Sequence, residues 1–230
     1  LSRSKALEFT SGLPLYWGDQ PGVSGPAYIG AIIFFLFVLG LFLVKGKAKW
    51  WLLGGTIFSL LLSWGKNFGL LTDFMIDYFP LYDKFRAVSS IQVILELCAP
   101  VLAVLGLVEV LKPSVENKKK LNALKASFLI VAGLCVALFV CKGMFTFTGQ
   151  SDEAYRKYFG DQVIAMIKLD REAVYTHDVF RSLIFVLLAA LAVWAYLKEK
   201  IKHNLLIVAL GALVVLDLVG IDLRYVNEED

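Results

Sequence analysis

Long apolar runs separated by short polar segments fill most of the chain after its first 25 residues. Six runs stand out, and they cover residues 26–44, 50–64, 91–111, 126–140, 179–197 and 205–219. Uninterrupted runs of this kind are typical of membrane spans and unlike the mixed periodicities of a soluble core. A helix rises about 1.5 Å per residue, so crossing about 30 Å of hydrocarbon takes about 20 residues. The second, fourth and sixth runs therefore need flanking residues, snorkelling or burial in protein.

The pattern predicts an all-α fold: a polytopic transmembrane helical bundle of about six helices. We find no internal repeat or low-complexity tract, so residues 1–230 are expected to form a single transmembrane domain. Two of the connecting segments, residues 65–90 and 151–175, have apolar side chains at helical spacing with charged residues between them. We predict that each contains an amphipathic helix lying on the membrane surface.

Composition agrees with a membrane protein. Hydrophobic residues make up 58% of the chain, and the mean hydropathy is +0.70, whereas soluble domains are about 45–50% apolar. The formal net charge is only +3, and the chain lacks the basic stripe with interleaved aromatics that tracks a nucleic-acid backbone. We expect the lipid bilayer, and no nucleic acid, as a partner.

Lysine is unevenly distributed between alternate connections. The connections at residues 45–49, 112–125 and 198–203 hold a clear lysine excess, whereas the opposite segments are nearly balanced in charge. Because Lys and Arg in short loops resist translocation, the lysine-rich side is predicted to be cytoplasmic. Both ends would then be extracytoplasmic in a multi-pass protein of the bacterial cytoplasmic (inner) membrane. The first residues resemble no signal peptide, so we expect the natural N-terminus to lie upstream.

The segment before the third run is the strongest candidate for ligand binding. Lys84 and Arg86 precede Ser89 and Gln92, which have the spacing of a helix capping box. Because a helix N-terminus favours an anion and disfavours a cation, the two basic residues call for a negative partner. That partner is either Asp83 with lipid headgroups, or a bound phosphate that the Arg fork can hold through two hydrogen bonds.

Two aromatic turns form a second group of candidates. Trp17 and Asp19 lie in a polar turn before the first run, and Trp64 stands beside Lys66 where the second run ends. Aromatic rings at this depth are commonly membrane-interface residues, although rings beside polar groups also suit a sugar.

Several ionisable residues lie within or beside the predicted spans. Glu96 lies in the third run ahead of Pro100, and an intramembrane carboxylate is expected to face protein or a wet cavity. It is either a functional group or a protonated or hydrogen-bonded helix contact close to the external interface. Asp178 and Arg181 have the three-residue spacing of a helical ion pair. Neither His177 nor His203 nor any of the three cysteines has metal-site spacing, so we assign no metal ligand. No common catalytic motif is present.

Five phrases support a family resemblance. They read YWGDQ at residues 16–20, LSWGKN at 62–67, YDKFRAVSS at 82–90, DVFRS at 178–182 and DLRYVN at 222–227. Together they resemble the YfhO family of bacterial membrane proteins over nearly the whole chain. The resemblance implies a relative of the C-type glycosyltransferases, which move a sugar from a polyprenyl-phosphate carrier to an acceptor such as a cell-envelope glycopolymer.

Such enzymes usually carry their catalytic carboxylate, often with a divalent metal, in a loop upstream of the part that this chain resembles. The resemblance therefore implies no catalytic residue here, no cofactor bound by this segment, and a possible metal only in the full-length protein. Substrate binding is expected at Arg86, Lys84, Asp19, Trp17, Lys66 and Glu96. Two other readings stay open: a transporter or flippase of lipid-linked sugars, with Glu96 on the path, and a non-catalytic membrane scaffold.

Overall fold

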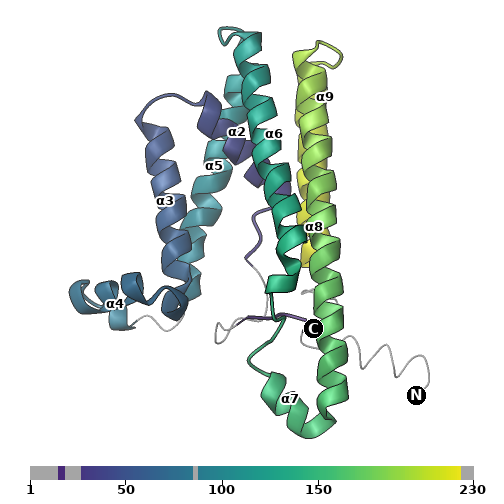
Figure 1. Ribbon diagram of the computed structural model, residues 1–230. Helices are drawn as coiled ribbons and strands as arrows, with labels where there is room; N and C mark the ends of the chain where they lie inside the picture. Colours follow the sequence, from purple (N-terminus) through teal and green to yellow (C-terminus); the bar gives the residue numbers. More distant parts are fainter. Residues whose placement is uncertain (1–14, 19–26, 85–87, 224–230) are drawn as a thin grey trace. The chain divides into compact units, whose positions relative to one another are not determined.

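The computed structural model describes residues 15–18, 27–84 and 88–223, and this part of the chain is almost entirely helical (Figure 1). The principal helices are α2 (Ala31–Leu43), α3 (Lys47–Ser63), α4 (Gly69–Tyr78), α5 (Gln92–Leu111), α6 (Asn117–Val140), α7 (Asp152–Phe159), α8 (Asp161–Leu197) and α9 (His203–Asp222). Among the described residues the only β-type contact is an isolated bridge between Gly18 and Gly149. The predicted all-α class is confirmed.

Each of the six apolar runs contains a helix, but these helices differ in length, and the first run is helical only over Ala31–Leu43. Four helical segments are long and apolar enough to cross a membrane, namely Ser89–Leu111, Asn117–Met144, Asp161–Leu197 and His203–Asp222. Helices α2 and α3 have 13 and 17 residues, fewer than the roughly 20 that a perpendicular crossing needs. The helical-bundle character is thus confirmed, and four of the six expected spans meet the length requirement on their own.

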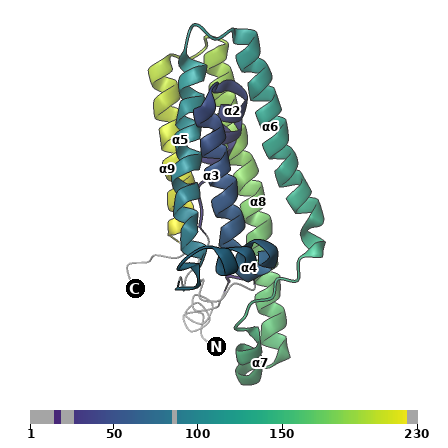
Figure 2. The same ribbon diagram turned by 90° about the vertical axis from the view of Figure 1, so that its left-hand side faces the viewer.

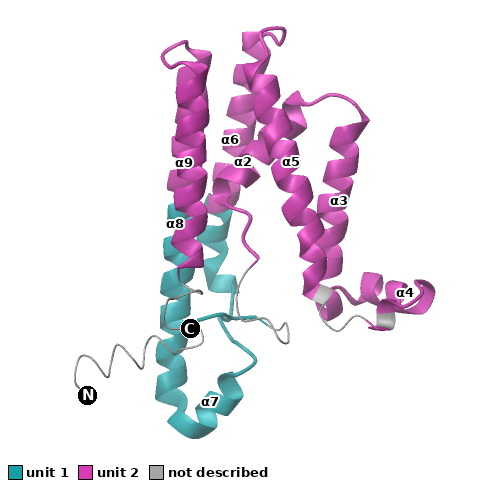
Figure 3. Ribbon diagram, turned by 180° about the vertical axis from the view of Figure 1, so that it is seen from behind, with its two compact units in different colours: residues 1–26, 136–181 teal, residues 27–135, 182–230 magenta. Residues whose placement is uncertain are grey.

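The chain divides into two compact units, which Figure 3 colours separately. Unit 1 comprises residues 1–26 and 136–181, and unit 2 comprises residues 27–135 and 182–230. In unit 2, α2 packs against α5 and α9, and α3 packs against α5 (Figure 2). Helix α2 supplies the centre of this core, since Ile32, Phe35 and Leu39 are fully buried.

Two glycines allow α2 and α5 to approach at backbone distance. A Cβ added to Gly106 would lie 2.6 Å from the Cα of Gly40, and one added to Gly40 would lie 2.5 Å from the carbonyl oxygen of Leu102. Both distances are too short for real atoms, so neither position accepts a side chain without a shift of a helix. Close approach through small residues is a common way of packing membrane helices.

The connection between α3 and α5 contains the first of the two predicted amphipathic helices. Helix α4 runs across the direction of α3 in Figure 1, and the side chains of Leu70, Phe74 and Tyr78 are exposed. The expected helix is confirmed. Its exposed apolar side chains suit a membrane surface, and its location there stays a prediction.

Residues 151–175 are helical as expected, but they are divided differently from the prediction. Helix α7 ends at Gly160, whose φ of 81° is a left-handed conformation that glycine adopts readily. Helix α8 then runs for 37 residues without interruption, so the expected break before residue 179 is absent. The polar stretch around residues 168–178 suggested that break, but residues 161–197 contain no Gly or Pro to end a helix.

Candidate functional site

The residues proposed for carrier or sugar binding are spread over several elements. Arg86 and Asp19 lie outside the described residues. Lys84 ends the short 3₁₀ turn η2 (Tyr82–Lys84), Lys66 lies in η1 (Gly65–Phe68), and both side chains are exposed. The two lysines therefore flank α4 in the same connection of unit 2, whereas Trp17 belongs to unit 1.

The N-terminus of α5 differs from the predicted capping box. The helix begins at Gln92 with Ile91 as its N-cap, and no side chain caps it by a hydrogen bond. Gln92 donates from Nε2 to the Oγ of Ser63 at 3.1 Å instead. The amide therefore joins α5 to the end of α3, which a spacing rule within one helix cannot anticipate.

Glu96 was expected to face protein or a wet cavity, and in the described part of the chain it is not buried against protein. Its side chain is exposed on the surface of α5. Glu96 is the fifth residue of the helix, close to one end of the span. A carboxylate at that depth can extend toward the headgroup region, which makes protein burial unnecessary.

Trp17 contributes to a packed aromatic cluster in unit 1, formed by Trp17, Phe145, Phe147 and Tyr175. The ring centroid of Trp17 lies 4.9 Å from that of Phe147 and 5.7 Å from that of Phe145. The Tyr175 ring lies 5.5–5.7 Å from both phenylalanines, and its hydroxyl donates to the carbonyl of Leu138 at 3.0 Å. The indole thus packs against three other rings, as in a small core.

A buried ion pair lies close to this aromatic cluster along the chain. The side chain of Arg171 in α8 is 1% exposed, and its two terminal nitrogens each lie 2.9 Å from one carboxylate oxygen of Asp152 in α7. Nη1 also donates to the carbonyl of Phe147 at 2.9 Å, and the amide of Gly149 donates to Asp152. Arg171 therefore joins α7, α8 and the 145–149 loop.

Burial alone raises the pKa of Asp152, because a desolvated carboxylate is costly. The hydrogen bond from Arg171, the amide of Gly149 and the positive charges of Arg171 and Lys168 act in the other direction. Their combined effect holds the pKa of Asp152 below its ordinary value. The carboxylate is consequently ionised at neutral pH, where its ion pair with Arg171 stabilises this part of unit 1.

Asp217 of α9 is the second buried acid with a defined role. Its side chain is fully buried, and it accepts a hydrogen bond from the Tyr28 hydroxyl at 2.8 Å and one from the amide of Ala31 at 2.7 Å. Ala31 is the first residue of α2, whose N-cap Gly30 offers no side chain. Asp217 therefore caps α2 from another helix, where a negative charge also complements the helix dipole.

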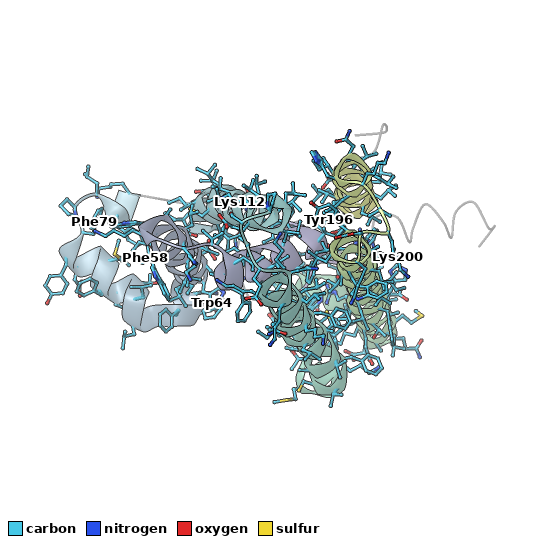
Figure 4. The ribbon with its side chains drawn as sticks, turned by 90° about the horizontal axis from the view of Figure 1, so that it is seen from above. Phe58, Trp64, Phe79, Lys112, Tyr196 and Lys200 are labelled. Atoms are coloured by element: carbon cyan, nitrogen blue, oxygen red, sulfur yellow. The ribbon has the colours of Figure 1, made fainter. Side chains whose placement is uncertain are left out.

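Side chains from neighbouring helices cap three C-termini at the lysine-rich end of unit 2. Lys49 donates to Leu41 O of α2 at 3.1 Å, Lys120 donates to Lys112 O after α5 at 2.7 Å, and Asn117 donates to Leu197 O of α8 at 3.0 Å. Figure 4 looks onto this end, where Lys112 and Lys200 are labelled. Two of the lysines counted for orientation are thus bound to protein carbonyls.

The remaining ionisable and thiol side chains form no recognisable catalytic or metal site among the described residues. Asp178 and Arg181 lie on α8 at the expected spacing, and Asp178 also lies 3.6 Å from the Nδ1 of His177. Of the three free cysteines, Cys135 is buried, Cys98 is half-buried and Cys141 is exposed. The described residues contain no group of three His, Cys, Asp or Glu that could hold a metal ion.

Sequence reasoning missed Asp217, Asp152 and Arg171. Asp217 is the one acid in the last apolar run, so the rule that intramembrane carboxylates have a specific partner applied to it as well as to Glu96. Arg171 and Asp152 carried no comparable signal, because they stand among many charges in residues 151–178.

Comparisons with protein-family models, with curated proteins and with solved structures give no match for this chain.

Proposed function

We propose that the chain is the membrane-embedded part of a glycosyltransferase that uses a polyprenyl-phosphate sugar and acts on a cell-envelope glycopolymer. In this proposal the segment between α4 and α5 binds the carrier phosphate through Arg86 and Lys84. The family resemblance supplies the reaction class. The resemblance implies a catalytic carboxylate upstream of this part of the protein.

One observation carries the proposed binding site: the position of Lys84 between an apolar surface helix and a span. Exposed Leu70, Phe74 and Tyr78 suit α4 for the membrane surface, and η2 follows α4 directly. Helix α5, which is long and apolar enough to cross the bilayer, begins at Gln92. This position of Lys84 supports a phosphate site at headgroup depth, and the proposal adds Arg86, which stands two residues further along the sequence.

The test replaces Arg86 in the full-length protein. Arg86→Gln removes the charge at similar length and should weaken carrier binding by about tenfold to a hundredfold, the value of a charged hydrogen bond. Arg86→Lys should restore only part of the affinity, because an ammonium lacks the bidentate fork. Lys118→Gln, at the opposite end of the spans, removes one exposed charge and should leave affinity unchanged.

Carrier affinity and melting temperature are measured on the same purified variants. Unchanged affinity with a lowered melting temperature for Arg86→Gln would show a structural ion pair and would reject the phosphate site. The extracytoplasmic position of residues 65–90 is tested separately, by impermeant labelling of single introduced cysteines in intact cells. Labelling of residues 112–125 from outside, with residues 65–90 protected, would contradict it.

A transporter of lipid-linked sugars is the second candidate, and one observation favours it. Helix α2 has 13 residues, and its first amide is bound by the buried carboxylate of Asp217. Short helices with N-termini inside the membrane are frequent in transporters. Carrier translocation by proteoliposomes, without sugar transfer to an acceptor by the full-length protein, would favour this candidate over the transferase.

A further inference from the structure

The turn between α2 and α3 carries a positive charge that no nearby acid in the sequence offsets. Lys45, Lys47 and Lys49 stand within five residues, and residues 20–72 contain no Asp or Glu. Lys45 and Lys47 are exposed. Neither forms an ion pair within the part of the chain that the structure describes.

The other two lysine-rich connections differ in this respect. Lys112 is ion-paired with Glu109, and Glu116 stands close to Lys118 and Lys119 in sequence. Glu199 lies between Lys198 and Lys200. The charge of the α2–α3 turn is therefore the most available of the three to an outside anion.

Two exposed tryptophans follow these lysines at the start of α3. Trp50 is 64% exposed and Trp51 is 79% exposed. The Nζ of Lys49 lies 5.0 Å from the centroid of the Trp50 ring, in a cation–π contact, while it also donates to Leu41 O. Indole rings favour the boundary between headgroups and acyl chains, because one edge is polar and the body is apolar.

The depth of these groups matches that boundary. Trp50 and Trp51 are the fourth and fifth residues of α3, so they lie roughly 5–6 Å along the helix from its first residue. After them α3 continues with apolar side chains, of which Ile57 and Phe58 are exposed. The exposed lysines thus precede an apolar, outward-facing stretch, with the indoles between them.

From this arrangement we propose that the α2–α3 turn is a binding site for an anionic phospholipid of the surrounding bilayer. Lys45 and Lys47 contact the headgroup phosphate, and Trp50 and Trp51 pack against the glycerol and the upper acyl chains. The first turn of α3 contains no acidic residue, so the positive end of the helix dipole adds to the attraction of the lysines. Lys49, held by Leu41 O and Trp50, keeps the tryptophan in place.

The test uses native mass spectrometry of the full chain released from detergent, titrated with phosphatidylglycerol or phosphatidylcholine. The wild-type chain should prefer phosphatidylglycerol. Because each lysine near an anionic surface contributes about fivefold to the affinity, the double variant Lys45→Gln, Lys47→Gln should lose about tenfold to thirtyfold in phosphatidylglycerol affinity. Its phosphatidylcholine affinity should stay within about twofold.

The matched control is Lys118→Gln with Lys119→Gln, which removes two exposed lysines from the α5–α6 connection. Its phosphatidylglycerol affinity should remain near that of the wild type. An equal loss in both double variants would mean a general attraction to basic residues and would overturn the site. Equal wild-type affinity for the two lipids would also overturn it.

Two further variants separate the site from a folding effect. Lys45→Arg with Lys47→Arg keeps the charge and should retain most of the phosphatidylglycerol preference. Trp50→Ala with Trp51→Ala should weaken the binding of both lipids, because the proposed indole contacts are to the glycerol and acyl chains, which the two lipids share. If the arginine variant, with an unchanged melting temperature, lost as much preference as the glutamine variant, the proposed charge contact would be rejected.

Discussion

The carboxylate of Asp217 binds the backbone amide of Ala31 at 2.7 Å, so α9 caps the helix that begins 186 residues earlier in the chain. The same carboxylate accepts the hydroxyl of Tyr28, which fixes the extended residues leading into α2. Because the Asp217 side chain is fully buried, a polar atom that loses its partner there is costly, and the contact should be sensitive to substitution.

We predict graded losses of stability at this contact. Tyr28→Phe removes the hydroxyl that donates to Asp217 and should destabilise by about 1 kcal/mol. Asp217→Leu removes the acceptor at 2.7 Å from the Ala31 amide, leaves that amide only the Tyr28 hydroxyl at 3.2 Å, and should cost about 2–3 kcal/mol. Asp217→Asn keeps an acceptor oxygen and should fall between them. Thermal melting in one detergent gives the order, and a Leu variant as stable as the wild type would contradict the capping role.

The glycine contact between α2 and α5 gives a second prediction. Gly106→Ala places a methyl group 2.6 Å from the Cα of Gly40, so the helices must separate, at a cost of about 1–3 kcal/mol, as for overpacked cores. Gly133→Ala is the control, because nothing lies within 4 Å of a Cβ there and alanine favours the helix. Equal melting temperatures for the two variants would contradict close packing.

The ion pair of Arg171 and Asp152 should be costly to break from one side. Arg171→Met leaves a buried, uncompensated carboxylate, for which the typical loss is about 3–5 kcal/mol. Adding Asp152→Leu should recover part of that loss, because the unpaired charge is then removed. Hydrogen exchange of α7 and α8 residues near the pair is the readout. A double variant that exchanges faster than Arg171→Met would count against this explanation.

The lowered pKa of Asp152 predicts a defined pH dependence. A carboxyl whose folded pKa is depressed contributes stability above its unfolded pKa, about 4, and loses that contribution as the pH falls through the folded value. The melting temperature of the wild type should therefore fall more steeply below about pH 4 than that of Asp152→Asn, which cannot titrate. Parallel curves for the two proteins would exclude a contribution from this group.

Capping by Lys120 is tested by two neighbouring alanine substitutions. Lys120 is buried and donates to Lys112 O at 2.7 Å, so Lys120→Ala should cost about 1.5–3 kcal/mol, the typical value of a hydrogen bond to a charged group. Lys119→Ala removes an exposed lysine from the same helical turn and should change stability by less than about 0.5 kcal/mol. Similar melting temperatures for both would show that the cap contributes little.

The apolar runs predicted the existence and order of the helices, because the length of a run is a local property of the sequence. They also predicted helices at residues 69–78 and within 151–175, where apolar spacing is regular. The boundary near residue 179 was wrong. Charged side chains at 168–178 indicate an aqueous environment, but polarity alone does not end a helix. The nearest helix break is at Gly160, just before α8 begins.

The buried polar contacts were beyond sequence reasoning for a different reason. Asp217 and Tyr28 are 189 residues apart, and nothing local distinguishes an acid that caps another helix from one that faces lipid headgroups. Gln92 had suitable spacing for a local cap, yet it bonds to Ser63 of α3. Tertiary partners decide such roles.

The pairing of Asp217 with Ala31 has a consequence for biosynthesis. A ribosome adds about 5–20 residues per second, so the 186 residues between Ala31 and Asp217 take roughly 10–40 s to translate. During that interval α2 has already emerged, and its Ala31 amide has only the Tyr28 hydroxyl as an acceptor. The shorter hydrogen bond to the carboxylate forms when α9 arrives, so completion of this cap waits for the last helix.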